Sequence, residues 1–120
     1  MIWQGSLQPA PEAPTLVLGT MSMVAEENVT LVGVGVHGGE AGLRLGWRVR
    51  EGSCAAPGDP LASSSTAFPE FVLNESGEGE SQTALLGRAQ DAPTYAGQLF
   101  AAGGASGGQL LACANLTRQN

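Results

Sequence analysis

Two cysteines, Cys54 and Cys113, carry the clearest covalent chemistry in this sequence. Their even number in a glycine-rich, acidic chain predicts a disulfide between them. Closing a loop of this length would stabilise the folded state by about 4 kcal/mol, because the cross-link removes entropy from the unfolded chain. Disulfides persist in oxidising compartments, so this prediction places the protein outside the cytoplasm. The alternative is a pair of buried free thiols in a cytosolic protein.

No arrangement of residues indicates catalysis. The single histidine, His37, precedes two glycines, and a lone histidine is more typical of a turn than of a metal site, which needs several ligands. The three serines at 63–65 have no base beside them, and no glycine pattern of a phosphate-binding loop follows an expected strand. We therefore predict that the protein is not an enzyme and binds no cofactor.

All five basic residues are arginines, in a chain with eleven acidic residues. Three of them, which we call the arginine face, alternate with apolar residues along one stretch: Arg44, Arg48 and Arg50. Side chains alternate across a strand, so the three arginines should share the outer face while Trp47 faces the core. Arginine suits carboxylate groups, and the arginine face is therefore a candidate docking surface for an acidic protein partner. The alternative is internal pairing with Glu51, Glu70 and Glu80.

Residues 1–14 are predicted to form an extended, proline-rich arm, because the prolines at 9, 11 and 14 exclude a helix. Trp3 in this arm is a second candidate partner-binding residue, since an extended segment can lie across another protein or add a strand to it. The alternative for Trp3 is that it caps the end of its own domain. Residues 1–10 lack the basic start and long apolar stretch of a secretion signal.

Residues 15–120 predict one all-β domain. Short apolar runs are separated by turns rich in glycine and proline, and this regular spacing is typical of a sandwich or barrel. The expected strands cover residues 15–24, 29–36, 43–50, 67–73, 82–86, 95–102 and 109–116, with a hairpin joining 67–73 to 82–86. We therefore predict a Greek-key β-sandwich or flattened barrel of seven to eight antiparallel strands.

Length and charge limit the possible partners. The chain has 120 residues, which suits one domain with one core. Its formal net charge of −6 would repel a phosphate backbone or an anionic membrane surface, so nucleic acid is not an expected partner. No apolar run is long enough to cross a bilayer, so we expect no direct membrane span.

The stretch 47–54, taken with residues 111–116, resembles the bacterial copper/zinc superoxide dismutase-like β-sandwich family. In that family a strand carrying His-x-His runs into a Gly-x-Cys turn, and this cysteine pairs with one in the last strand. Cys54 and Cys113 match these two cysteines. Arg48 and Arg50 stand where the His-x-His pair would be, Phe100 stands where a further histidine would be, and residues 55–68 contain no histidine. The resemblance therefore implies a degenerate member that lacks the metal ligands, because arginine stays protonated and repels cations.

These observations predict a non-catalytic, extracytoplasmic module, periplasmic or secreted. We expect it to act as an accessory subunit that binds other protein subunits and stabilises a larger assembly, possibly one associated with a membrane. One alternative is a residual metal-binding or dismutase-like protein that uses His37 with nearby carboxylates. Another alternative is a secreted adhesive or inhibitor-like module.

Overall fold

A computed structural model describes residues 1–11, 17–61, 68–102 and 108–119. This part of the chain contains nine strands and no helix. The strands are β1 (Ile2–Pro9), β2 (Leu18–Ala25), β3 (Val29–His37), β4 (Arg44–Gly52), β5 (Pro57–Pro60), β6 (Phe71–Val72), β7 (Gly79–Leu86), β8 (Thr94–Ala101) and β9 (Leu110–Gln119).

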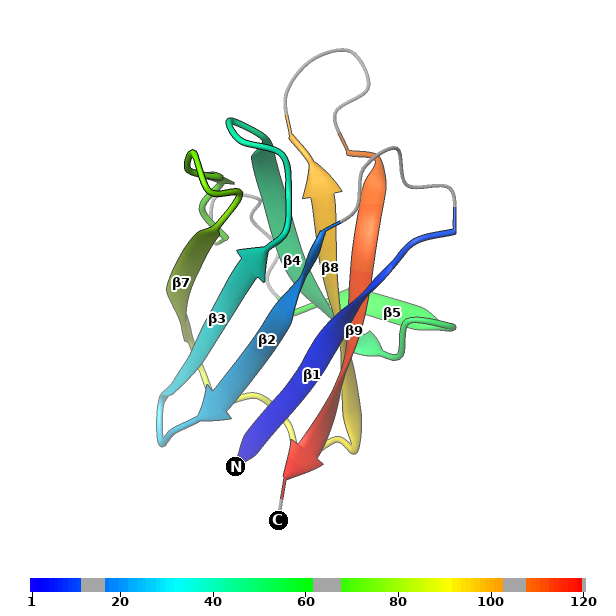
Figure 1. Cartoon of the computed structure of the whole chain (residues 1–120). Helices are drawn as coiled ribbons and strands as arrows, with labels where there is room; N and C mark the ends of the chain where they lie inside the picture. The colour runs from blue at the N-terminus through cyan, green and yellow to red at the C-terminus, as the bar shows by residue number, and fades with distance from the viewer. Residues whose placement is uncertain (12–16, 62–67, 103–107, 120) are drawn as a thin grey trace.

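The strands form one continuous antiparallel sheet in the order β5-β4-β8-β9-β1-β2-β3-β7, and β6 pairs with β4. The sheet curls so that β1, β2, β3 and β7 make one wall and β4, β8 and β9 make the other (Figure 1). The pairing of β1 with β9 joins the two walls. The predicted all-β, flattened-barrel architecture is confirmed, with nine strands in place of the expected seven to eight.

The core lies between the two walls and follows the two-residue period of the strands. Buried residues alternate along the central strands of both walls, with Val32, Val34 and Val36 in β3 and Leu45, Trp47 and Val49 in β4. The indole of Trp47 packs edge-to-face against the ring of Phe68, and its Nε1 donates a hydrogen bond to the carbonyl of Pro69 at 2.7 Å. The prediction that Trp47 belongs to the core is therefore confirmed.

The first nine residues do not form a separate arm. β1 lies inside the sheet between β9 and β2, so the predicted arm is wrong for this segment. Proline excludes a helix but can end a strand, and β1 ends at Pro9. Residues 12–14 of the predicted arm lie outside the described residues.

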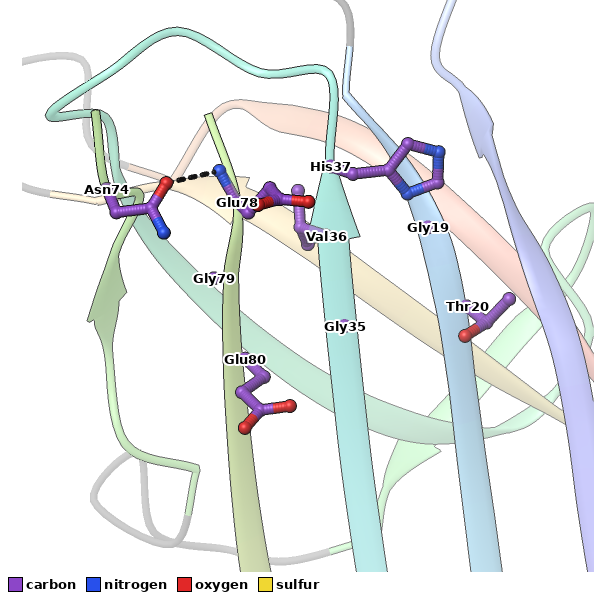
Figure 2. Close-up of a pocket in the computed structure, with 9 residues that line it drawn as sticks. All are labelled: Gly19, Thr20, Gly35, Val36, His37, Asn74, Glu78, Gly79 and Glu80. Carbon is purple, nitrogen blue, oxygen red and sulfur yellow. Dashed lines mark hydrogen bonds between the residues drawn. The ribbon is translucent and has the colours of Figure 1, made fainter. Parts of the chain in front are cut away.

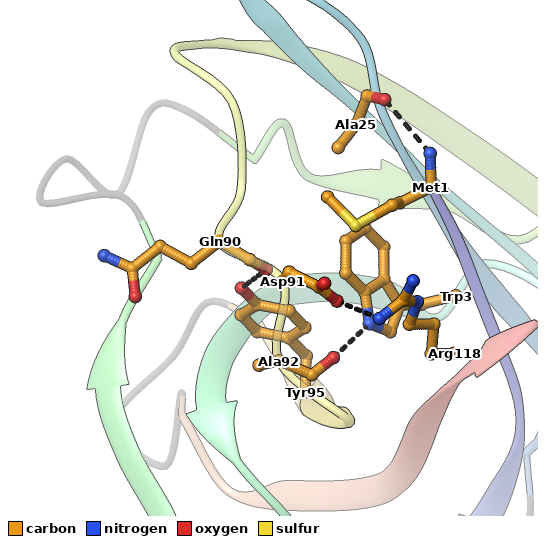
Figure 3. A network of polar contacts seen from close by, with 8 residues as sticks. All are labelled: Met1, Trp3, Ala25, Gln90, Asp91, Ala92, Tyr95 and Arg118. Carbon is orange, nitrogen blue, oxygen red and sulfur yellow. Dashed lines mark hydrogen bonds and ion pairs between the residues drawn. The ribbon is translucent and has the colours of Figure 1, made fainter.

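Trp3 is fully buried, which corrects its prediction as a partner anchor. Its ring meets that of Tyr95 edge-to-face at 5.3 Å between centroids. Its Nε1 donates a hydrogen bond to the carbonyl of Ala92 at 2.8 Å, as Figure 3 shows. Trp3 therefore closes one end of its own barrel, because its apolar body and its single donor are both satisfied internally.

The expected hairpin between 67–73 and 82–86 does not form. β6 pairs with β4, whereas β7 pairs with β3 in the opposite wall. The acidic turn between them crosses from one wall to the other. Asn74 shapes this turn, since its Oδ1 accepts hydrogen bonds from the backbone N–H groups of Ser76 and Glu78 at 2.9 and 3.0 Å. β6 occupies the part of the β4 edge that β5 leaves open, so neighbours in sequence are not neighbours in the sheet.

Candidate functional site

The arginine face lies on the outer surface of β4. Arg44 and Arg48 are exposed and Arg50 is half-buried, while the residues between them face the core or are glycine. None of the three pairs with Glu51, Glu70 or Glu80, because the one ion pair found among the described residues joins Arg118 to Asp91. The predicted placement on one face is therefore confirmed, and the alternative of internal salt bridges does not hold for these arginines in the described part of the chain.

The guanidinium of Arg50 is held in place by neighbouring groups. Its Nε donates a hydrogen bond to Oε1 of Gln98 at 3.0 Å, and Nη1 donates to the carbonyl of Gly58 at 3.0 Å. Gln98 is only 9% exposed, so its amide is a fixed acceptor within the sheet. These contacts leave other N–H donors of Arg50 unused, because a guanidinium carries five of them. Arg50 thus presents a positive charge in a preset orientation.

Arg48 rests on an aromatic ring. Its Cζ lies 4.5 Å from the ring centroid of Phe100 in the adjacent strand β8. Gly46 stands directly opposite Phe100 in the strand register, so no side chain of β4 competes for this space. A cation–π contact of this kind contributes about 0.5–1 kcal/mol at an exposed site. The stacking restrains Arg48 while leaving the edge of its guanidinium open to a ligand.

A disulfide stands beside the arginine face. Cys54 and Cys113 are bonded, with their Cα atoms 6.0 Å apart and a separation of 59 positions in sequence, so the predicted disulfide is confirmed. It ties the turn after β4 to β9. The backbone N–H of Cys54 also donates a hydrogen bond to Oδ1 of Asn115 at 2.8 Å. The segment that contains Gly58 is therefore anchored close to Arg50.

The positions that the family resemblance assigns to lost metal ligands lie together on this surface. Arg48 and Arg50 project from β4, and Phe100 lies on the strand that pairs with it. Arg44 extends the same face toward the end of the strand, whereas Trp3 lies in the core. Gln98 was not among the predicted site residues, because no local pattern marks a glutamine whose partner is set by strand pairing.

His37 lies on the other wall, at the edge of a shallow groove of about 500 Å³. Figure 2 shows its imidazole directed over β2, while Glu80 lies on β7 and Glu78 lies in the turn just before that strand. Within the described ranges, no three His, Cys, Asp or Glu side chains gather as a metal site would require. The groove therefore offers no ligand set for the alternative in which His37 binds a metal. The serines at 63–65 lie outside the described residues.

A polar network closes the end of the barrel where the chain begins. Arg118 forms an ion pair with Asp91, the hydroxyl of Tyr95 donates a hydrogen bond to the carbonyl of Gln90 at 2.6 Å, and the N-terminal amine donates to the carbonyl of Ala25 (Figure 3). Burial raises the pKa of Tyr95, and the nearby carboxylates of Glu51 and Asp91 act in the same direction. Burial and the two carboxylates therefore favour the neutral form of the Tyr95 phenol.

No protein-family model, curated protein or solved structure matches this chain. The similarity to the superoxide dismutase-like family therefore stays a prediction that rests on the quoted residues. No helix in the described part of the chain is long and apolar enough to cross a lipid bilayer.

Proposed function

We propose that the protein is a non-catalytic, extracytoplasmic binding module that uses its arginine face to dock a carboxylate-bearing surface of another protein subunit. Arg44 and Arg48 are exposed without an acidic partner among the described residues, in a chain whose net charge is −6. An acidic protein would ordinarily pair its few arginines internally. This unpaired, pre-oriented positive surface is the observation that carries the proposal.

Two further features support it. The disulfide supports an extracytoplasmic location, because such bonds persist in oxidising compartments. The placement of Arg48, Arg50 and Phe100 on one face supports a degenerate superoxide dismutase-like module, in which a former metal surface serves as a docking surface. In this proposal the module stabilises a larger assembly as an accessory subunit and needs no metal or cofactor.

The test is to isolate the protein from its native membranes and extracts under mild conditions, with co-purifying chains identified by mass spectrometry and metals by elemental analysis. We expect a stoichiometric partner chain whose retention falls at least about tenfold in Arg44→Glu and in Arg48→Glu, since reversing a charge at a complementary interface is repulsive. Raising the salt concentration should release the same partner, because exposed charges are screened.

Arg88→Glu is the matched control, because Arg88 is an exposed arginine outside the arginine face. This variant changes the net charge of the protein by the same amount as Arg44→Glu or Arg48→Glu. The partner should be retained by this variant. Equal loss from all three variants would indicate a general charge effect and would remove the arginine face from the proposal. Stoichiometric copper or zinc in the isolated protein would contradict its non-metal character.

A further inference from the structure

Two arginines of the arginine face lean over the same neighbouring strand, β8. Strand register places Arg50 opposite Ala96, yet its Nε donates a hydrogen bond to Gln98, two residues further along β8. Arg48 stands opposite Gln98, yet its guanidinium lies over the ring of Phe100, again two residues further along. The two arginine side chains therefore follow the same diagonal across the sheet and point in the same direction.

No acidic side chain of the adjoining strands neutralises these two guanidinium groups. β8 and β9 contain neither aspartate nor glutamate. Glu51 follows Arg50 in β4, but side chains alternate along a strand, so it points to the other face. Asp59 lies in β5 and forms no ion pair with Arg50 in the described part of the chain. Both guanidinium groups can therefore bind carboxylates of another molecule.

The strand sets the spacing of the two positive groups. Side chains two residues apart on one face of a strand lie about 6.8 Å apart, because a strand rises about 3.4 Å per residue. Since Arg48 and Arg50 follow the same diagonal, their guanidinium groups keep this spacing. An unrestrained arginine loses rotamer freedom when it binds, whereas these two are already ordered by Phe100 and Gln98. The pair therefore favours two carboxylates held at a matching distance.

We propose that Arg48 and Arg50 select an extended segment of the partner subunit that carries acidic residues two positions apart. Such a segment presents residues i and i+2 on one face about 6.8 Å apart, which matches the two arginines. Adjacent acidic residues would point to opposite faces, and only one could reach the pair. Neighbours on a helix face have Cβ atoms about 5–6 Å apart on a convex surface, a poorer match. This inference rests on the proposed function, because it specifies which partner segment docks there.

The experiment is an NMR titration of the full chain with three synthetic peptides at low salt concentration. The peptides share one composition, rich in threonine to favour an extended chain, and contain two glutamates each. The glutamates stand at i and i+2, at i and i+1, or at i and i+3, so only the first peptide presents both on one face. We expect the i+2 peptide to bind at least about threefold more tightly than the other two, because it alone engages both arginines.

Gln98→Leu and Phe100→Leu test whether these two residues position the arginines. Each variant removes the contact that restrains one guanidinium and leaves both arginines and the net charge unchanged. Both should abolish the preference for the i+2 peptide, while the affinity for the i+1 peptide stays at the wild-type value. A residue that served only stability would not change this ratio. Phe100→Tyr keeps an aromatic ring under Arg48 and should keep the preference.

Arg48→Gln and Arg88→Gln form a matched pair of variants. Arg48→Gln should lower the affinity for the i+2 peptide to that of the other peptides, whereas Arg88→Gln removes the same charge elsewhere and should keep the preference. Thermal melts identify any variant that fails to fold.

Three equal affinities for the wild-type protein, no binding of any peptide, or a preference that persists in both Gln98→Leu and Phe100→Leu would overturn the inference. The proposed function is tested separately by retention of the native partner in Arg48→Glu. Loss of that partner together with equal peptide affinities would keep the docking surface and reject an extended acidic segment.

Discussion

At the scale of single residues, Tyr95 shows how burial controls a titratable group. It is the one tyrosine in the sequence, and its ring is buried against Trp3. Burial raises its pKa above the value of about 10 that a tyrosine has in an unfolded chain. Below that pH both states keep the proton, and the free energy of unfolding does not depend on this group. Above it the unfolded state loses its proton first, so stability falls as pH rises toward the folded-state pKa.

Alkaline unfolding should therefore depend on Tyr95. We expect the free energy of unfolding in urea to fall as the pH rises above about 10, and to fall less steeply in Tyr95→Phe. At pH 7 the variant should lose about 1 kcal/mol, because the hydrogen bond to the carbonyl of Gln90 is removed. Ultraviolet titration of the single phenol gives an independent check. A phenolate midpoint at the unfolded value would contradict the burial argument.

The sequence predicted the arginine face because a period of two is enough to place Arg44, Arg48 and Arg50 on one side of a strand. It did not predict what restrains them. Gln98 and Gly58 reach Arg50 only because β8 and β5 flank β4, and strand order is not encoded in any local pattern. The disulfide needed no such information, since the chain has only two cysteines.

At the scale of elements, the strands with regular apolar alternation were predictable. β1 and β5 were not, because glycine or proline interrupts or bounds them. β1 was missed partly because Gly5 interrupts its apolar pattern. That glycine is required, since a Cβ there would lie 2.2 Å from the backbone oxygen of Asn115 in β9. β5 begins and ends with proline and was interpreted as a loop. Where one backbone packs closely on another, only glycine fits, and the apolar side chain that would mark a strand in the sequence is absent.

The turn that contains Gly77 packs against the turn that contains Gly39. Gly77 has φ of +76°, and a Cβ there would lie 2.2 Å from the backbone oxygen of Gly39. Gly87 has a similar φ of +94° but has open space around it. Gly87→Ala should cost about 1–2 kcal/mol, the price of a left-handed backbone for an alanine.

Gly77→Ala should lower the free energy of unfolding clearly more than Gly87→Ala, because the backbone at Gly39 must also shift to make room for the new Cβ. The amide of Gly39, which donates a hydrogen bond to the carbonyl of Gly77 at 3.2 Å, would lose its partner. Urea unfolding of both variants measures the difference directly. Equal losses would mean that the turns are not in tight contact and that only the backbone conformation matters.

At the scale of the whole molecule, the arginine face occupies only one of the two walls. It belongs to β4, whereas β1, β2, β3 and β7 form the opposite wall. A partner bound at the arginine face would therefore leave the opposite wall uncovered.

The disulfide acts on the whole fold, because it links residues 59 positions apart and joins the turn after β4 to β9 across the intervening strand β8. The double variant Cys54→Ala with Cys113→Ala should lose about 4 kcal/mol of unfolding free energy, most of it through a less restricted unfolded chain. Urea unfolding of the wild-type protein with and without a thiol reductant gives the same comparison without mutation. The reductant should leave the double variant unchanged, since that variant contains no cysteine. A loss below about 1 kcal/mol would show that the unfolded chain is already compact around this link, and that the strand pairings alone hold the barrel together.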